Sequence, residues 1–279
     1  LAVQATESVL RKTKTKKEKI DFVVFATSTP DYFVPGAGSI FQDKMGLKNI
    51  GVLDIRQGCS GFVYGLSVAD QYIKSKMYKN VLVIGAEVQT TQLDFDTEGR
   101  GTAIIFGDGA ASALLTSTDS AGKGILSSHL HSDGKFINEL GTLVPSPKIK
   151  GLINNQHIDE RKHHIYMNGR EVFRHAVKRF PEVILEGLEY NNLTLDDVKL
   201  VIPHQANYRI TRAVQKSLGV DEEKVFSNIH KFGNTTAASI GIALSEALDQ
   251  GKIEDNDIII LAAFGAGFYW CSNVIRWCK

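Results

Sequence analysis

The most constraining feature of the sequence is a structural pattern that occurs twice at a nearly constant offset. A buried-strand pattern at residues 20–26 recurs at 198–202, and another at 81–85 recurs at 258–262, about 177 positions further along the chain. Within each half, a glycine turn also precedes a helical pattern. This regular offset indicates an internal duplication. Because strands and helices alternate, we expect an α/β fold with largely parallel sheets covered by helices.

The duplication predicts two similar halves, residues 1–140 and 167–279, joined by a connecting loop at 141–166. Residues 133–166 have weak periodicity and a polar cluster, which are typical of a long functional loop or lid. Residues 103–106 and 111–115 flank a Gly-Asp-Gly turn and therefore predict two tightly joined strands.

Composition excludes several classes of function. The 279 residues include 32 basic and 31 acidic side chains, so the net charge of +1 gives no support for bulk electrostatic binding to nucleic acid or to a membrane. No apolar run approaches the roughly 18 to 20 residues that span a bilayer. The three cysteines form no metal-ligand spacing, and an odd number suits a reducing compartment. We therefore expect a soluble, cytoplasmic protein without a metal site.

Cys59 is the first candidate for chemistry. It lies between a short strand pattern at 52–55 and a helix in which Phe62, Leu66 and Ala69 recur at helical spacing. At such a strand-to-helix elbow, the free amides and the dipole of the helix favour a thiolate. A lone cysteine is more often a buried structural residue, so its partners must decide between the two interpretations.

The duplication supplies two partners. Asn234 occupies the position equivalent to Cys59 at the second elbow, and His204 follows the strand pattern at 198–202. Ligands of open α/β sheets bind at the carboxyl ends of strands, so we expect these three residues to meet at one site. A Cys-His-Asn set suits covalent catalysis on an acyl group, because imidazole and amide can donate hydrogen bonds to a developing oxyanion.

The remaining histidines are interpreted more simply. The sequence places them mainly in or near the loop region, where a surface polar role is the default interpretation; the residues are His129, His131, His157, His163 and His164. No carboxylate or cysteine spacing completes a metal site around His163 and His164.

Two further features lie near the predicted strand ends. The Gly265-Ala266-Gly267 segment follows the last long strand and could direct a backbone amide toward an oxyanion, although its glycines alone indicate only a turn. Three basic residues are spaced by three and four on the helix after His204, namely Arg209, Arg212 and Lys216. A solvated face is the default interpretation, and docking of an acidic carrier domain is the alternative.

Taken together, these motifs resemble β-ketoacyl-acyl-carrier-protein synthase III, the condensing enzyme that starts type II fatty acid synthesis. The matching stretches run almost end to end and are Cys59-Ser60-Gly61-Phe62, Gly99-Arg100-Gly101-Thr102, Phe106-Gly107-Asp108-Gly109-Ala110, Pro203-His204-Gln205-Ala206-Asn207, His230-Lys231-Phe232-Gly233-Asn234-Thr235 and Phe264-Gly265-Ala266-Gly267-Phe268. The resemblance implies the thiolase fold, in which two similar halves form a five-layered αβαβα sandwich, and it implies a homodimer.

The resemblance also implies residue roles. Cys59 corresponds to the acylated nucleophile, His204 and Asn234 to the pair that promotes decarboxylation, and the amides of Cys59 and Ala266 to the oxyanion hole. The positions that match the coenzyme A and substrate channel are Arg100, Gly101, Phe173, Ala206, Asn207 and Phe264. Those that match the carrier-protein docking segment and its basic face are Gln205, Arg209, Arg212 and Lys216.

Three departures from the family pattern stand out. The family has a further N-terminal strand and helix, with a Trp/Arg clamp for adenine, whereas this sequence begins at Leu1 in a helical pattern. We therefore expect the natural chain to start upstream. The loop at 133–166 is longer than in well-known members, so the resemblance does not predict which acyl-CoA serves as the primer. Cys271 replaces a frequent glycine, which we interpret as a packing change.

The resulting hypothesis is a decarboxylative Claisen condensation of a short acyl-CoA, acetyl-CoA being favoured, with malonyl-acyl-carrier protein. Acyl-CoA is then a substrate, and no cofactor is expected. Three alternatives remain: a related synthase of secondary metabolism with another acyl primer, a Cys-His-Asn thioester hydrolase, and a non-enzymatic assembly subunit.

Overall fold

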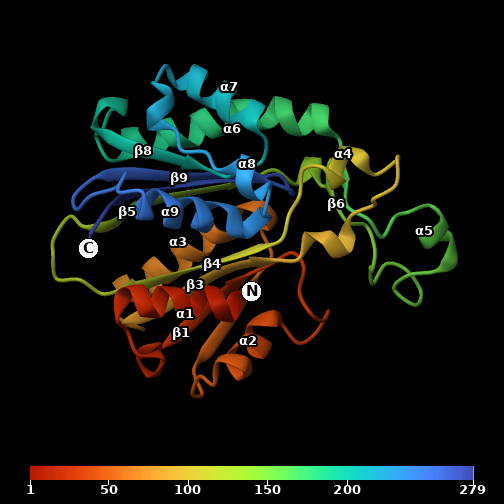
Figure 1. Cartoon of the computed structure of the whole chain (residues 1–279), viewed down its shortest axis with the longest axis horizontal. Helices are drawn as coiled ribbons and strands as arrows, with labels where there is room; N and C mark the ends of the chain where they lie inside the picture. The colour runs from red at the N-terminus through yellow and green to blue at the C-terminus, as the bar shows by residue number, and fades with distance from the viewer. Residues whose placement is uncertain (279) are drawn as a thin grey trace.

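Two β-sheets enclose a central pair of helices, and further helices cover the outer face of each sheet (Figure 1). The computed structural model describes residues 1–278. Its principal strands are β1 Phe22–Ala26, β2 Gly51–Ile55, β3 Asn80–Glu87, β4 Gly109–Thr116, β5 Gly124–Ser132, β8 Val198–Pro203, β9 Ile258–Gly265 and β10 Tyr269–Arg276. Its α-helices are α1 Ala2–Thr13, α2 Ala37–Met45, α3 Gly61–Lys74, α4 Arg100–Ala103, α5 Asn155–Asp159, α6 Gly169–Tyr190, α7 Tyr208–Leu218, α8 Ile229–Phe232 and α9 Ser239–Asp249.

The two sheets repeat one topology. The first has the order β2-β1-β3-β4 and the second has the order β5-β10-β9-β8. In each, a parallel pair is followed by an antiparallel strand, so β1-β3-β4 corresponds to β8-β9-β10. Phe22 lies opposite Val81 in the first parallel pair, and Val198 lies opposite Ile258 in the second. The repeated order that the sequence predicts is therefore present in the fold.

Strand alternation divides the apolar residues among three cores. On β1, Val24 faces the central helices α3 and α9, whereas Val23 and Phe25 face α1 and α2 on the outer side. On β9, Ile259 likewise packs in the central core, and Ile260 packs in the outer core with α6 and α7. Both sheets are thus covered on both faces, which explains their continuous apolar runs. The five layers follow the order α1/α2, first sheet, α3/α9, second sheet, α6/α7 (Figure 1).

The central layer depends on close helix contacts. A Cβ atom on Gly241 of α9 would lie 2.5 Å from Cβ of Ala111 and 3.0 Å from the ring of Phe62. A Cβ on Gly61, at the start of α3, would lie 2.9 Å from Cβ of Ala26. Glycine at these positions lets α3 and α9 approach their neighbours more closely than any larger residue would allow.

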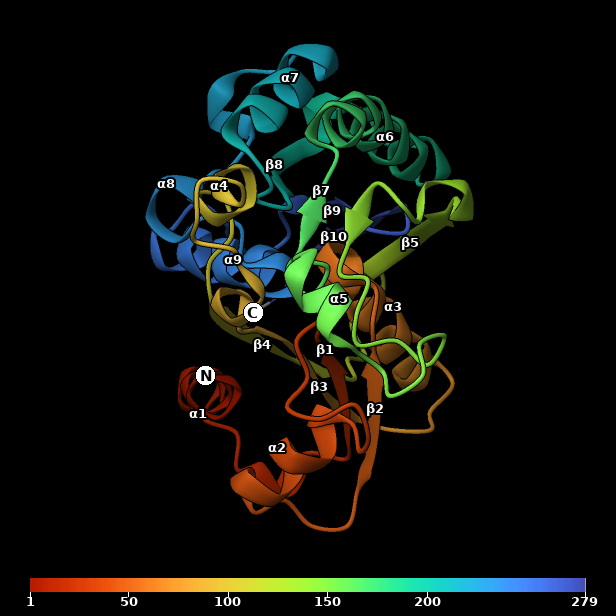
Figure 2. The ribbon, with the colours of Figure 1, turned by 90° about the vertical axis from the view of Figure 1, so that its right-hand side faces the viewer.

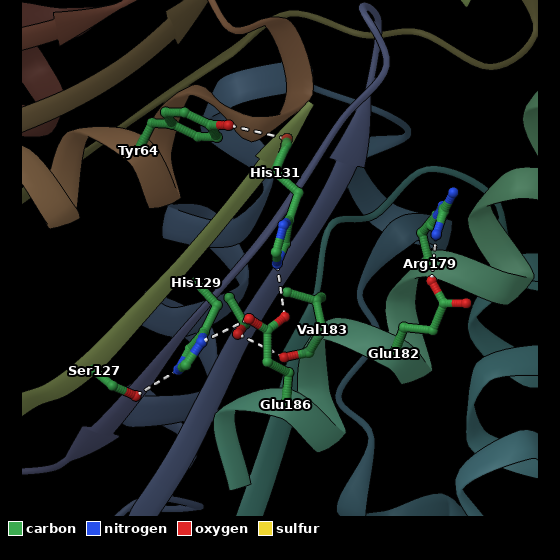
Figure 3. A network of polar contacts seen from close by, with 9 residues as sticks. Tyr64, Ser127, His129, His131, Arg179, Glu182, Val183 and Glu186 are labelled. Carbon is green, nitrogen blue, oxygen red and sulfur yellow. Dashed lines mark hydrogen bonds and ion pairs between the residues drawn. The ribbon is translucent and has the colours of Figure 1, made fainter. Parts of the chain in front are cut away.

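A polar network joins α6 to β5 on the outer face of the second sheet (Figure 3). Glu186 contacts Nδ1 of His129 at 3.2 Å and Nε2 of His131 at 2.6 Å, and the other ring nitrogen of His129 lies 2.9 Å from the hydroxyl of Ser127. His129 is buried in this network. The prediction of a surface role for His129 is therefore wrong, because the sequence analysis missed the strand β5 that carries it.

Two local predictions also differ from the structure. Residues 100–103 form the short helix α4, and β4 pairs with β3, so the predicted hairpin around the Gly-Asp-Gly turn is absent among residues 1–278. The connecting region is not a simple loop, since it contains α5 and the two-stranded pair β6 Leu140–Gly141 and β7 Tyr166–Met167. This region projects from one end of the sandwich (Figures 1 and 2).

We predict that Gly241→Ala destabilises the fold by about 1–3 kcal/mol, because the added methyl group overpacks the contact with Ala111 and Phe62. The matched control is Gly134→Ala, whose Cβ would have no neighbour within 4 Å, and we expect it to change stability by no more than about 0.5 kcal/mol. Urea unfolding measures both free energies. Equal stabilities for the two variants would contradict this account of the central layer.

Candidate active site

Cys59 lies at the predicted elbow between a strand and a helix. The strand β2 ends at Ile55, the 3-10 turn η2 spans Gly58–Ser60, and α3 begins at Gly61. Gly58 has a φ of 49°, a left-handed conformation that glycine adopts without strain. The turn buries the Cys59 side chain at the N-terminal end of α3.

The end of β9 covers the cysteine. A Cβ atom on Gly265 would lie 2.7 Å from Cβ and 3.3 Å from Sγ of Cys59, so only glycine fits beside this side chain. The backbone amides of Cys59 and Ala266 both lie near the sulfur and lower the pKa of the thiol. Two backbone amides beside one thiol are donors of the type that forms an oxyanion hole.

Asn234 lies at the second elbow, after Gly233 and before the 3-10 turn η7 Thr236–Ala238 and α9. Residues of the first half hold its backbone, because its N–H donates to the carbonyl of Ile105 at 2.9 Å and its carbonyl accepts from the N–H of Gly107 at 3.0 Å. Its side-chain Oδ1 accepts from the N–H of Thr236 at 2.9 Å. This bond fixes the amide orientation and leaves Nδ2 as the group able to donate elsewhere.

His204 follows β8 directly, and its side chain is 1% exposed. The backbone N–H of His204 donates to the carbonyl of Ala262 on β9 at 2.7 Å. Nδ1 lies 2.5 Å from the hydroxyl of Ser239, the first residue of α9. Nε2 is buried, and no hydrogen-bond partner among residues 1–278 engages it. A buried nitrogen without a protein partner is a group held ready for a ligand.

The elements that carry the three residues converge. The turn η2 packs against both η7 and the end of β9, and β9 is the neighbour of β8. Cys59, Asn234 and His204 therefore all lie in the region where the N-terminal ends of α3 and α9 meet the strand ends of the second sheet. This placement is where we expected the three residues, at the carboxyl ends of strands.

Burial dominates the electrostatics of the thiol. Desolvation, together with the nearby carboxylate of Glu87, raises the pKa of Cys59 to about 12, and the amides of Cys59 and Ala266 only partly oppose this. The expected preference for thiolate is therefore wrong for the resting protein. The sequence showed the helix N-terminus but not the depth of burial or the carboxylate beside it.

Burial acts on the other two titratable groups as well. It lowers the pKa of His204 to about 3, so the imidazole is neutral at physiological pH. It also raises the pKa of Glu87 to about 7, against hydrogen bonds from Ser28, Thr29 and the amide of Ala237. The site therefore contains a thiol and a neutral imidazole rather than a thiolate–imidazolium pair.

The predicted channel residues are spread over several elements. Arg100 and Gly101 are exposed on α4, and Phe173 is partly exposed on α6. Asn207 caps α7 by accepting from the N–H of Arg209 at 2.9 Å, and Ala206 beside it is half-buried. Phe264 is buried in the outer core of the second sheet. Figure 2 shows α4 on the side of the molecule that faces the viewer.

The predicted docking residues divide into two groups. Arg209, Arg212 and Lys216 are exposed on α7, with Arg212 in an ion pair with Glu222. Gln205 is only 1% exposed. Its amide hydrogen-bonds to four internal groups, namely the carbonyls of Pro203 and Phe226, the hydroxyl of Ser227 and the N–H of Asn228. It therefore cannot touch a docked protein in this conformation, and its role is to shape the turn after His204.

Ser239 and Glu87 were not among the residues predicted from the sequence. Glu87 ends β3, and Ser239 begins α9. Polar residues at strand ends and at helix starts are a recognisable signal, and the strand-end argument that singled out His204 applies equally to Glu87.

The described residues contain neither a metal-binding cluster nor a helix suited to span a membrane. Among residues 1–278, no group of three or more His, Cys, Asp or Glu side chains is arranged to hold a metal ion. In the same part of the chain, no helix has both the length and the apolar composition needed to cross a bilayer.

Comparisons with known proteins point to one family. Residues 53–134 match the profile of 3-oxoacyl-[acyl-carrier-protein (ACP)] synthase III, and residues 188–277 match the profile of its C-terminal part. The beta-ketoacyl-[acyl-carrier-protein] synthase III of Caldanaerobacter subterraneus subsp. tengcongensis is 42% identical over 279 residues, which cover 100% of this chain and 83% of that protein.

Solved structures agree with the sequence comparison. The crystal structure of 3-oxoacyl-[acyl-carrier-protein] synthase III from Aquifex aeolicus VF5 is similar with a TM-score of 0.89 and 38% identity, covering 99% of this chain and 83% of that one. The synthase III structure from Thermus thermophilus is similar with a TM-score of 0.90 and 37% identity, covering 100% of this chain and 84% of that one. The predicted thiolase fold, with its duplicated halves, is confirmed.

We predict that alkylation of Cys59 by iodoacetamide accelerates about tenfold per pH unit between about pH 7 and pH 9.5, because only the thiolate reacts and its pKa is about 12. Peptide mass mapping measures the rate at Cys59, and a Cys59→Ser variant identifies the signal. A rate that levels off toward about pH 9.5, as for an ordinary thiol with a pKa of about 8.5, would contradict the assigned protonation state.

Proposed function

This chain belongs to the 3-oxoacyl-[acyl-carrier-protein] synthase III family, and on that premise we propose that Cys59, His204 and Asn234 catalyse its condensation of a short acyl-CoA with malonyl-acyl-carrier protein. Members of this family are acyltransferases that start fatty acid synthesis. The observation that carries the residue assignment is the pair of backbone amides, of Cys59 and Ala266, aimed at the buried thiol. Acetyl-CoA is the primer that we propose.

The first half-reaction transfers the acyl group to the cysteine. The Cys59 sulfur attacks the thioester carbonyl of acyl-CoA, and the amides of Cys59 and Ala266 stabilise the oxyanion that forms. The thiol proton leaves with the coenzyme A sulfur, so the products are acyl-Cys59 and free coenzyme A. No redox change occurs, and the proposal therefore includes no cofactor.

The second half-reaction forms the carbon–carbon bond. Loss of carbon dioxide from malonyl-acyl-carrier protein leaves an enolate, whose oxygen accepts hydrogen bonds from Nε2 of His204 and Nδ2 of Asn234. The enolate carbon attacks the acyl-Cys59 carbonyl, which expels the Cys59 thiolate and gives the 3-oxoacyl-carrier protein. Because the pKa of Cys59 is about 12, the released thiolate takes up a proton and the resting thiol returns.

Neutral histidine suits this second step. Burial keeps His204 uncharged, and its unpaired Nε2 faces no competing protein acceptor among residues 1–278. A neutral donor stabilises an enolate without holding a permanent charge in a dry site, where an unpaired charge would be costly.

We also propose a cytoplasmic homodimer. The loop between β1 and α2 exposes three large apolar side chains, Tyr32, Phe33 and Val34, with exposed fractions of 62%, 51% and 79%. Adjacent exposed apolar side chains are typical of a protein contact surface. The molar mass of the chain in solution tests this proposal, and a monomer at micromolar concentration would refute it.

We predict that His204→Ala and Asn234→Ala still accept an acetyl group on Cys59 but lose condensation by on the order of 100- to 1000-fold, because each removes one donor to the enolate. Mass spectrometry measures acylation, and product formation from malonyl-acyl-carrier protein measures condensation.

Matched controls remove the same residue types elsewhere. His129 and Asn191 both make hydrogen bonds on the outer face of the second sheet, so His129→Ala and Asn191→Ala should keep condensation. Normal condensation by either site variant would refute the assignment. Release of free acetate without a 3-oxoacyl product would instead indicate a thioester hydrolase.

We predict that Arg209→Glu raises KM for malonyl-acyl-carrier protein about tenfold or more and leaves acylation by acetyl-CoA unchanged, because a basic face steers an acidic carrier. Lys252→Glu is the matched control, since Lys252 is exposed on the turn before β9, at the opposite end of the strand from Gly265. Equal KM values for the two variants would show that the carrier protein does not dock on α7.

A further inference from the structure

Ser239 makes two polar contacts beside the proposed site. It is the first residue of α9 and its side chain is 2% exposed. Its hydroxyl oxygen lies 2.5 Å from Nδ1 of His204 and 3.4 Å from the backbone nitrogen of Gln205. One hydroxyl group therefore touches both residues that follow β8.

The direction of these bonds follows from counting protons. The N–H of Gln205 can only donate, so the hydroxyl oxygen of Ser239 accepts that bond. The hydroxyl carries one proton of its own, and Nδ1 of His204 is the remaining polar atom that the described residues place within its hydrogen-bond reach. The O–H of Ser239 thus donates to Nδ1, which must present a lone pair.

The opposite placement of the protons is less stable. If Nδ1 of His204 carried the proton and donated to the serine oxygen, the hydroxyl proton of Ser239 would have no acceptor in a buried environment. A buried polar group without a partner destabilises the state that contains it. The geometry therefore favours one of the two neutral forms of the imidazole.

We propose that Ser239 is a positioning residue that holds His204 in the tautomer with its proton on Nε2. A neutral imidazole has a single N–H, and with Nδ1 occupied by the serine hydroxyl that N–H must be at Nε2. Nε2 is the buried nitrogen without a protein partner among residues 1–278. The inference rests on the proposed function, in which this N–H donates to the enolate oxygen.

The same short segment orients both donors of the site. The N–H of Thr236 binds Oδ1 of Asn234 and so leaves its NH₂ group able to donate elsewhere, and Ser239 three residues later sets the proton of His204. Segment 234–239 thereby prepares two N–H donors for one oxygen before the substrate arrives. Preorganised donors of this kind need no rearrangement during the reaction.

The test is ¹⁵N NMR of the full chain labelled at histidine, together with kinetics of the two half-reactions. A His204→Ala spectrum identifies the His204 signals among the eight histidines. We expect a pyridine-type shift for Nδ1 and a pyrrole-type shift for Nε2 in the unmodified chain. In Ser239→Ala we expect a mixture of both tautomers, a fall in condensation of on the order of 10- to 100-fold, and unchanged acylation of Cys59.

Two further variants separate positioning from folding. Ser239→Thr keeps a hydroxyl group and should restore the Nε2–H spectrum and most of the condensation rate. Ser272→Ala removes another buried serine hydroxyl, one that donates to the carbonyl of Val183 at 2.9 Å, and should change neither the His204 spectrum nor condensation.

A protonated Nδ1 in the unmodified chain would overturn the proposal, and so would Ser239→Ala with an unchanged tautomer and unchanged condensation. If Ser239→Ala does not fold, the unmodified chain and Ser239→Thr still decide the tautomer. If the unmodified chain does not condense at all, the proposed function is wrong. The ¹⁵N shifts of His204 still show whether Ser239 sets its tautomer, because they do not depend on condensation.

Discussion

The close approach of two turns, η2 before α3 and η7 before α9, is the constraint on which the site depends. A Cβ atom on Gly85 of β3 would lie 2.5 Å from the carbonyl oxygen of Ala237, so the second turn sits directly on a strand of the first sheet. Glu87, at the end of the same strand, accepts hydrogen bonds from Ser28 of the first half and from the amide of Ala237 of the second half. These contacts bring residues far apart in the sequence into one buried region.

That burial decides the protonation states and therefore the chemistry. It raises the pKa of Cys59 and lowers that of His204, so each group rests in its neutral form. A thiolate–imidazolium pair, which a cysteine hydrolase would use, is disfavoured on both sides. Neutral donors aimed at an oxygen are instead suited to stabilising an enolate for the short time that it exists.

The buried strands and the turns before the central helices could be predicted from the sequence, because each depends on a local pattern of residues. Continuous apolar runs at β1, β3 and β9 and the glycine turns before α3 and α9 report directly on buried strands and elbows. The predicted hairpin around Gly107 was wrong because the same glycine turn instead serves a long-range contact, in which the N–H of Gly107 binds the carbonyl of Asn234. Local patterns do not distinguish between these two uses.

The candidate site could be predicted only in part, for a related reason. Residue types and strand ends pointed to Cys59, His204 and Asn234, but the pKa of Cys59 depends on burial and on Glu87, which the sequence does not place nearby. The role of Gln205 depends on internal carbonyl partners, and that of Ser239 depends on a contact across 35 positions. Such properties follow from tertiary packing rather than from spacing along the chain.

In the proposed reaction, Cys59 carries the acyl group between two substrates. Intact-protein mass spectrometry after mixing with acetyl-CoA, followed by peptide mapping and a chase with malonyl-acyl-carrier protein, tests it directly. We expect one acetyl group on Cys59 that disappears as acetoacetyl-acyl-carrier protein forms. An acetyl group located on another residue, or one that remains on Cys59 while the condensation product accumulates, would contradict it.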